Sequence, residues 1–166
     1  EMYVYHGTSI DTIKAIIENG MIKEMAENSA DPTAGKKYSA NAHGIGIYFA
    51  RYLDYSINSG YARPMYEKKN KNGEWIPASS TKDAMRERKC VLMCRAVMGT
   101  SQTCSNALQS IPDLLPKSQL RFNSFCNAGI YDKNLGKNVP NVYVHGATTD
   151  GQCYPEFLLN FVRDIK

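Results

Sequence analysis

The order of the apolar segments constrains the fold of this chain more than any other feature. A strand-like segment at residues 2–5 precedes isoleucines that repeat at helical spacing, between Ser9 and Gly20, which are typical of helix ends. We therefore predict a helix over residues 10–19. A long polar loop at 22–43, a short strand at 47–50 and a second helical pattern at 53–61, which ends before Pro64, follow in that order.

The remainder of the chain is dominated by strand patterns. Residues 66–89 are polar and predict an exposed excursion, whereas residues 90–98 predict a central strand. Residues 142–147 and 153–162 predict a hairpin, because Thr-Thr-Asp-Gly between them is a turn signal. Because strands and helices do not alternate regularly, we predict one α+β domain over residues 1–166 with a mainly antiparallel sheet. Its start on a strand favours a module of a longer chain.

Composition excludes several classes of protein. The apolar runs are short and interrupted, so we predict neither a membrane partner nor a secretory segment. Neither GxGxxG nor GxxxxGK[ST] occurs, which disfavours Rossmann and P-loop nucleotide sites. A net charge of +4, with scattered basic residues, fits a phosphate-rich ligand without implying binding to duplex DNA.

The cysteines and histidines indicate the cellular compartment and whether a metal site is present. Five cysteines without paired CxxC spacing predict reduced thiols and an intracellular location, cytoplasmic or nuclear. The three histidines are far apart, and no pair has the spacing that places two imidazoles on one helical face. We therefore predict no metal site.

Three segments are candidates for chemistry, and each is ambiguous by itself. The strand end at His6-Gly7 could bind a planar amide, although a lone histidine there is more often satisfied locally. Residues 44–64 gather tyrosines and hydroxyls that could form a slot for a flat ring, although most such tyrosines are packing residues. Residues 152–159 have the pattern of an edge strand that contains one proline.

In this order, the three segments resemble the catalytic domain of the poly(ADP-ribose) polymerase family, especially its macrodomain-containing mono-ADP-ribosyltransferase members. The matching motifs are His-Gly-Thr at residues 6–8, Gly-Ile-Gly-Ile-Tyr-Phe-Ala at 44–50, Tyr-Ser at 55–56 and Gln-Cys-Tyr-Pro-Glu-Phe-Leu at 152–158. Residues 95–99 and 122–124 also resemble family segments. The resemblance covers nearly all of the chain. It implies the ADP-ribosyltransferase fold, a split and mainly antiparallel sheet with flanking helices, and NAD as co-substrate.

The resemblance also implies a role for each matching residue. His6 would bind a ribose hydroxyl of NAD, and the main chain of Gly7 would pair with the nicotinamide carboxamide. Ser56 would bond the same carboxamide, and Tyr61 would stack on the pyridine ring. Tyr48 would pack against the nicotinamide ribose, and the long loop at 22–43 would cover the donor. The implied donor-binding set comprises His6, Gly7, Thr8, Tyr48, Phe49, Ala50, Ser56 and Tyr61.

The third catalytic position departs from the polymer-forming members, which have a glutamate there. After His6 and Tyr48, this position falls on Val142 when Pro140 is aligned, or on Val144 when the count runs back from Gln152. Both candidates are apolar. The nearest acid, Glu156, belongs to the Tyr-Pro-Glu motif and is predicted to be structural or exposed. Without a glutamate base, activating a sugar hydroxyl is difficult, so we predict transfer of one ADP-ribose to a protein acceptor such as a carboxylate.

Two other functions are compatible with the same motifs. A catalytically silent NAD-binding or interaction module would keep the fold without turnover, although an intact His6 argues against this. A tRNA 2′-phosphotransferase would need basic residues arranged for a phosphate, and no such arrangement is visible in the sequence. A nucleic-acid acceptor is therefore not indicated.

Overall fold

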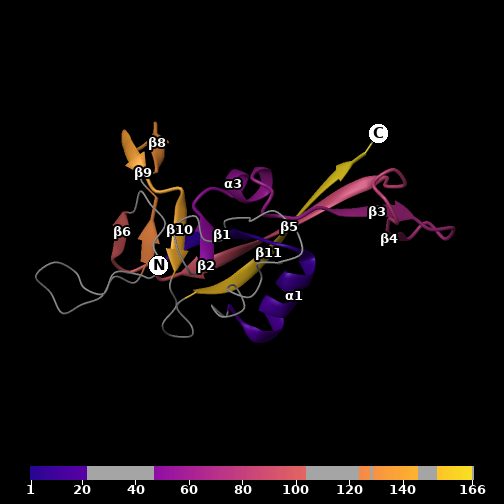
Figure 1. Cartoon of the computed structure of the whole chain (residues 1–166), viewed down its shortest axis with the longest axis horizontal. Helices are drawn as coiled ribbons and strands as arrows, with labels where there is room; N and C mark the ends of the chain where they lie inside the picture. Colours follow the sequence, from indigo (N-terminus) through magenta and orange to yellow (C-terminus); the bar gives the residue numbers. More distant parts are fainter. Residues whose placement is uncertain (22–46, 104–123, 128, 146–152, 166) are drawn as a thin grey trace, which may run out of the picture.

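A computed structural model describes residues 1–21, 47–103, 124–127, 129–145 and 153–165 (Figure 1). The predicted loop at 22–43 lies outside these ranges. The described elements, in chain order, are β1 (Met2–Gly7), α1 (Ile10–Asn19), β2 (Ile47–Ala50), α3 (Leu53–Asn58), β3 (Met65–Lys69), β4 (Trp75–Pro77), β5 (Arg86–Ala96), β6 (Ser101–Thr103), β7 (Ser124–Cys126), β8 (Ile130–Asp132), β9 (Lys137–Val139), β10 (Val142–His145) and β11 (Cys153–Asp164).

The strands form a nine-stranded sheet in the order β4-β3-β5-β1-β2-β10-β7-β6, with β11 added through β5, and a separate two-stranded sheet, β8-β9. Every pairing is antiparallel except that of β6 with β7. Few helices accompany this sheet. The mainly antiparallel sheet is therefore as predicted, and the two described helices beside it are compatible with the predicted α+β class.

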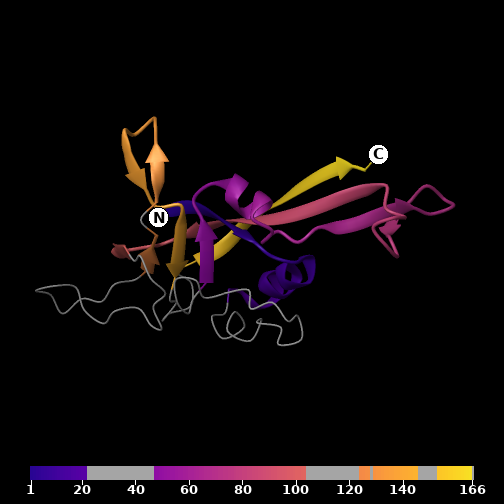
Figure 2. The same ribbon diagram turned by 45° about the horizontal axis from the view of Figure 1, so that its top comes forward.

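The large sheet is nearly interrupted between β1 and β2. These strands share one register pair, Tyr5 with Ala50, whereas β1 pairs with β5 along all six of its residues. The strand direction also changes between β1 and β2. In two views, β2 and β10 run across the direction of β5 and β11 (Figures 1 and 2). The end of β1 therefore lies at the place where the two parts of the sheet diverge.

In the core, α1 packs against the face of the sheet that carries Val4, Leu92 and Cys94. Ile13 of α1 is fully buried, and Ile10 and Ile16 pack beside it. The Ser9 hydroxyl accepts a hydrogen bond from the Thr12 N–H, and Gly20 closes the other end with a φ of 83°. The predicted helix over residues 10–19 is confirmed, because its periodicity and both caps are local signals.

The second helix is shorter than predicted. Helix α3 ends at Asn58, and the following residues turn back, so that the Ala62 N–H bonds the Ser56 carbonyl at 3.0 Å. Gly60 adopts a φ of 82° within this turn, a conformation that glycine adopts without strain. The turn moves Tyr61 out of the helix and onto the loop that follows it.

The predicted hairpin between residues 142–147 and 153–162 is wrong. Strand β10 pairs with β2 and β7, whereas β11 pairs with β5 from Cys153 to Asp164. The Thr-Thr-Asp-Gly segment lies outside the described residues. A turn signal reports local backbone preference, whereas β11 gains a longer ladder and more packing against the central strand than a hairpin would supply.

The predicted exposed excursion over residues 66–89 is correct only in part, since many of its residues are exposed but it contains β3, β4 and the start of β5. Asn70 closes the β3–β4 turn by accepting hydrogen bonds from the N–H groups of Asn72 and Glu74, each at 2.9 Å. The Trp75 ring packs under the Arg86 guanidinium at 3.6 Å. Long cationic side chains therefore cover apolar surface here. Because these strand residues are charged, the sequence of the segment reads as polar.

Glu67 is a buried anion of β3 that two arginines neutralise. It pairs with Arg86 Nε and with Arg88 at 3.0 Å. We expect Glu67→Gln to lower the free energy of unfolding by about 1–3 kcal/mol, because it leaves two partly buried cations without their carboxylate. Urea denaturation measures this change. The matched change Glu74→Gln in the exposed turn should alter stability by less than about 0.5 kcal/mol, and equal losses would contradict the prediction.

Candidate functional site

The end of β1 places His6 against β2. Its Nδ1 lies 2.8 Å from the Tyr48 carbonyl oxygen, and its ring meets the Phe49 ring edge-on with centroids 5.8 Å apart. Because a carbonyl oxygen only accepts, Nδ1 must carry the proton and donate. The neutral ring then presents Nε2 as a hydrogen-bond acceptor. His6 can therefore receive a hydroxyl hydrogen from a ligand while β2 holds its orientation.

The environment keeps this imidazole neutral. Burial lowers the pKa of His6, and the hydrogen bond to the Tyr48 carbonyl opposes that shift by a smaller amount. We expect the imidazole to titrate below pH 6.5, its ordinary value. As the pH falls through 6.5, the unfolded chain takes up a proton that the folded protein does not, so stability decreases.

A side-chain NMR titration of the histidines measures this directly, with His6→Gln used to assign the His6 resonance. The stability of the His6→Gln variant should depend less on pH below 6.5 than that of the natural protein. A His6 midpoint at or above 6.5 would contradict the predicted desolvation.

Gly7 meets the turn after α3 at a distance that excludes any side chain. A Cβ atom there would lie 2.9 Å from both the Ala62 nitrogen and the Ser56 carbonyl oxygen, and 3.1 Å from Tyr61 Cβ. On its other side, the β1–β2 ladder has ended, since Tyr5 is the residue of β1 that pairs with described β2. The main chain at Gly7 is therefore fixed by close packing, and its β2-facing edge has no strand partner within the described residues.

Ser56 and Tyr61 both lie beside Gly7, at opposite ends of the turn that follows α3. Ser56 is 2% exposed, and its hydroxyl donates to the Tyr5 carbonyl at 3.3 Å. Tyr61 is 46% exposed, and its Cβ lies beside Gly7. The Arg63 N–H bonds the Thr8 carbonyl at 3.2 Å, which ties the loop to the residue after Gly7. The structure thus brings four of the predicted site residues, Gly7, Thr8, Ser56 and Tyr61, into one cluster.

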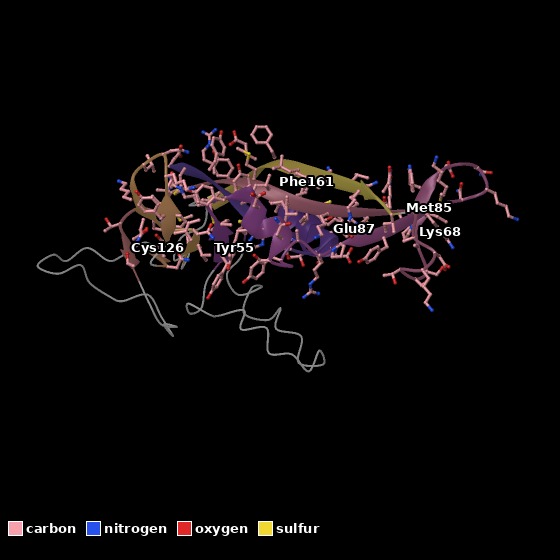
Figure 3. All side chains as sticks on the ribbon, turned by 90° about the horizontal axis from the view of Figure 1, so that it is seen from above. Tyr55, Lys68, Met85, Glu87, Cys126 and Phe161 are labelled. Carbon is pink, nitrogen blue, oxygen red and sulfur yellow. The ribbon has the colours of Figure 1, made fainter. Side chains whose placement is uncertain are left out.

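Tyr55 supports the exposed Tyr61 ring. The two ring centroids are 5.7 Å apart with an interplanar angle of 31°. Burial, followed by the hydrogen bond to Tyr61, raises the pKa of Tyr55 to about 12. Tyr55, a residue of α3 that Figure 3 labels, therefore remains a neutral phenol.

The other predicted site residues lie on β2 and β10. Phe49 belongs to the core, Ala50 is buried, and Tyr48 is half-buried and supplies the carbonyl that holds His6. Val142 pairs with Ala50 in the ladder, and Val144 pairs with Tyr48. Neither alignment of the third catalytic position places a carboxylate opposite these two residues of β2.

Glu156 has a structural partner. Its carboxylate accepts two hydrogen bonds from Arg95, at 2.8 and 3.2 Å, and Arg95 also donates to the Tyr3 hydroxyl at 2.9 Å. These contacts join β11, β5 and β1 in a lateral network. They agree with the structural position that the sequence predicts for this acid.

The cysteines and the possible metal ligands show no reactive grouping in the described ranges. Cys90, Cys94, Cys126 and Cys153 are buried free thiols, and Cys104 lies outside those ranges. Burial raises the pKa of all four. Where side chains are described, no three metal-binding residues gather. None of the described helices has the length and apolar character needed to cross a bilayer.

One functional candidate was missed by sequence reasoning. An open cleft of about 570 Å³ lies between α3 and the β8–β9 hairpin, with Asp132 at its wall. The Tyr52 hydroxyl donates to Asp132 at 2.8 Å, and this bond is the main reason that the pKa of Asp132 is lowered. The Asp132 carboxylate also accepts the N–H groups of Asn134 and Leu135, as a turn-forming aspartate does. The sequence Asp-Lys-Asn-Leu-Gly was the signal that could have revealed this hairpin.

Comparison with known proteins gives one similarity over the whole site. No protein-family model matches the chain. The chain is 27% identical over 161 residues to a protein named protein mono-ADP-ribosyltransferase PARP14 from Homo sapiens. The alignment covers 97% of this chain and 7% of that relative, so the chain spans a small part of the relative's length. This distant similarity is compatible with a relationship to the poly(ADP-ribose) polymerase family.

Proposed function

We propose that the chain is the catalytic domain of an intracellular NAD-dependent mono-ADP-ribosyltransferase that modifies a protein. The observation that carries the proposal is the cluster of Gly7, Thr8, Ser56 and Tyr61 next to His6 at the junction of the sheet. A Cβ atom at Gly7 would collide with the turn that joins Ser56 to Tyr61. The distant similarity to a mono-ADP-ribosyltransferase over 97% of the chain supports the same function.

The donor would be held at both of its ends. The main-chain edge of Gly7, which has no strand partner among the described residues, can pair with the nicotinamide carboxamide, and Ser56 lies next to that edge. The exposed ring of Tyr61 can stack on the pyridine ring, and Nε2 of His6 can accept a hydrogen bond from a ribose hydroxyl. Tyr48 would contact the nicotinamide ribose and Thr8 the adenosine half. Phe49 and Ala50 would hold β2 in place behind them.

This arrangement suits cleavage of the bond between nicotinamide and ribose. As that bond breaks, its electron pair returns to the pyridinium ring, nicotinamide leaves neutral, and positive charge develops on the sugar. An acceptor carboxylate then forms the new bond to the ribose carbon and needs no proton removed. Holding both ends of the donor fixed is the main catalytic device, so no protein nucleophile is required.

The absence of an acid at the third catalytic position favours one transfer over polymer growth. Chain extension requires a base to activate the hydroxyl of a bound ADP-ribose. Val142 is apolar and buried, and Val144 is also apolar. A protein carboxylate, which is already deprotonated, avoids this requirement. The third position would then orient the donor ribose by contact alone.

Incubation with NAD labelled on the adenylate tests the proposal. We expect label to enter the protein or a lysate acceptor as single units, which gel mobility and mass spectrometry of the products resolve. Each labelled acceptor should gain one ADP-ribose, and nicotinamide should be released in equal amount. If NAD binds but neither label transfer nor nicotinamide release occurs, the transferase function is excluded and a silent module remains.

Thermal-shift titration with benzamide, a mimic of nicotinamide, tests the donor pocket separately. We expect a concentration-dependent rise of the melting temperature because the ligand binds the folded state. Tyr61→Ala should remove most of that rise, whereas Tyr131→Ala, which truncates an exposed tyrosine on the β8–β9 hairpin, should not. An equal rise in both variants would contradict the predicted stacking on Tyr61.

A further inference from the structure

We propose that the cleft between α3 and the β8–β9 hairpin binds an arginine side chain of the acceptor protein, an inference that rests on the proposed transferase function. The arginine would anchor the acceptor segment, and a neighbouring carboxylate of that segment would receive the ADP-ribose. The cleft is open and measures about 570 Å³. This volume is typical of pockets that bind small ligands and leaves room for a long side chain.

The cleft adjoins the proposed donor site through two of its residues. Tyr55 lines the cleft and packs its ring against Tyr61, and Ser56 follows it in α3. Asn141 lines the cleft from the other side and immediately precedes Val142, the predicted third catalytic position. A segment bound here would therefore lie beside the donor pocket without occupying it.

Asn141 supplies the second observation that points to a ligand. This residue is 9% exposed, and its Oδ1 is buried without a hydrogen bond from any residue in the described ranges. Its main chain is already held, since the N–H donates to Asn127 Oδ1 at 2.9 Å and the carbonyl accepts from Arg51. A buried acceptor without a donor costs stability. A ligand N–H group could remove this cost only if the Asn141 side chain turned toward the cleft, because Oδ1 has almost no accessible surface.

The charges of the cleft favour a cationic donor. Asp54 is exposed on α3, and the described residues form no ion pair with it, so its carboxylate is available to a ligand. The carboxylate of Asp132 is already occupied by Tyr52 and the hairpin turn, and Arg51 lies near enough to contribute to its lowered pKa. Lys133 is the cation on the rim and is exposed, as Asp54 is, so screening affects both charges, and the two carboxylates of the lining outnumber the one cation.

The aromatic lining distinguishes a guanidinium from other cations. Tyr52, Tyr55 and Tyr131 all contribute to the walls of the cleft. A guanidinium can stack on such rings and still direct its five N–H donors in its own plane toward oxygen acceptors. An arginine could thus pair with the Asp54 carboxylate while its stem covers a tyrosine face. An ammonium has no such planar set of donors.

Binding of two synthetic peptides tests the inference without any turnover. One decapeptide contains glycine, serine, a single glutamate and a single arginine, and its partner has citrulline, the neutral isostere, in place of the arginine. We expect the arginine peptide to bind at least about tenfold more tightly in an NMR titration, with the side-chain amide signal of Asn141 among those that shift. Raising the ionic strength should reduce the difference.

Two matched variants complete the test. Asp54→Asn should weaken binding of the arginine peptide by about tenfold. Asp11→Asn on α1 should not weaken it, because that carboxylate is 88% exposed and does not line the cleft. Release of nicotinamide from NAD by water, measured without peptide, should be equal in both variants. Equal binding of the two peptides, or no effect of Asp54→Asn, would overturn the anchor even if nicotinamide release persists. Failure of the natural protein both to release nicotinamide and to transfer label from NAD to any acceptor would instead exclude the transferase function.

Discussion

Replacing His6 with alanine is expected to weaken the binding of NAD by about a hundredfold or more, since each lost hydrogen bond to a buried partner costs about 1–3 kcal/mol. The substitution removes two interactions at once. In the proposed site, the ribose hydroxyl would lose Nε2 as its acceptor, and the Tyr48 carbonyl loses its donor. Titration calorimetry with NAD measures the loss. Unchanged affinity in His6→Ala would contradict the assignment of the donor site.

The variant His6→Asn separates these two interactions. The asparagine amide nitrogen lies close to the position of Nδ1, so it can still donate to the Tyr48 carbonyl, but no atom replaces Nε2. We expect His6→Asn to be nearly as stable as the natural protein and yet to bind NAD as weakly as His6→Ala. Recovery of NAD affinity in His6→Asn would show that the histidine acts through β2 and not through the ribose.

Replacing Gly7 with alanine is expected to destabilise the fold by about 1–3 kcal/mol and to abolish measurable binding of NAD. The new Cβ would lie 2.9 Å from two main-chain atoms, the Ala62 nitrogen and the Ser56 oxygen. Main-chain atoms of a hydrogen-bonded turn cannot move away individually. The turn must therefore shift as a unit, which displaces Ser56 and Tyr61 together from the positions proposed to bind the carboxamide and the pyridine ring. Urea denaturation and calorimetry measure the two effects.

Gly20→Ala is the matched control for the loss of a glycine. Gly20 has a φ of 83°, and no atom of the described residues lies within 4 Å of the Cβ position, so its substitution strains the backbone without a collision with them. We expect a stability loss of about 1 kcal/mol with NAD affinity unchanged. If Gly7→Ala retained NAD affinity at a similar cost in stability, the close packing at Gly7 would not define the site.

The helix predictions were accurate where interactions between residues near in sequence determine the structure, and inaccurate where contacts after the helix end determine it. Helix α1 was predicted correctly because its apolar period, its N-cap Ser9 and its C-cap Gly20 all lie within twelve residues. The end of α3 was predicted incorrectly, because the turn after it is held by Gly60 and by the Ala62-to-Ser56 hydrogen bond, which periodicity does not report. The sequence pattern identified the elements better than their ends.

Strand pairing was the larger failure, and its cause is physical. A strand pattern specifies which residues face the core, but every half-buried strand offers similar main-chain partners. The choice of β5 as the partner of β11, and of β2 as the partner of β10, depends on how much side-chain surface each pairing buries across the whole sheet. The cleft beside α3 was missed for the same reason, since its walls are brought together by pairings far apart in the chain.

The sequence by itself determined the helix α1, the strand character of most of the chain, the ordered motifs that resemble an ADP-ribosyltransferase, and the lack of an acid at Val142 and Val144. Those features are contained in short segments or in the spacing between them. Only the tertiary structure decided that β1 separates from β2 after Tyr5, that the turn after α3 closes on Gly7, and that Asn141 and Tyr55 border one cleft. Each of these depends on contacts between segments distant in sequence, whose free energy exists only once the sheet has formed.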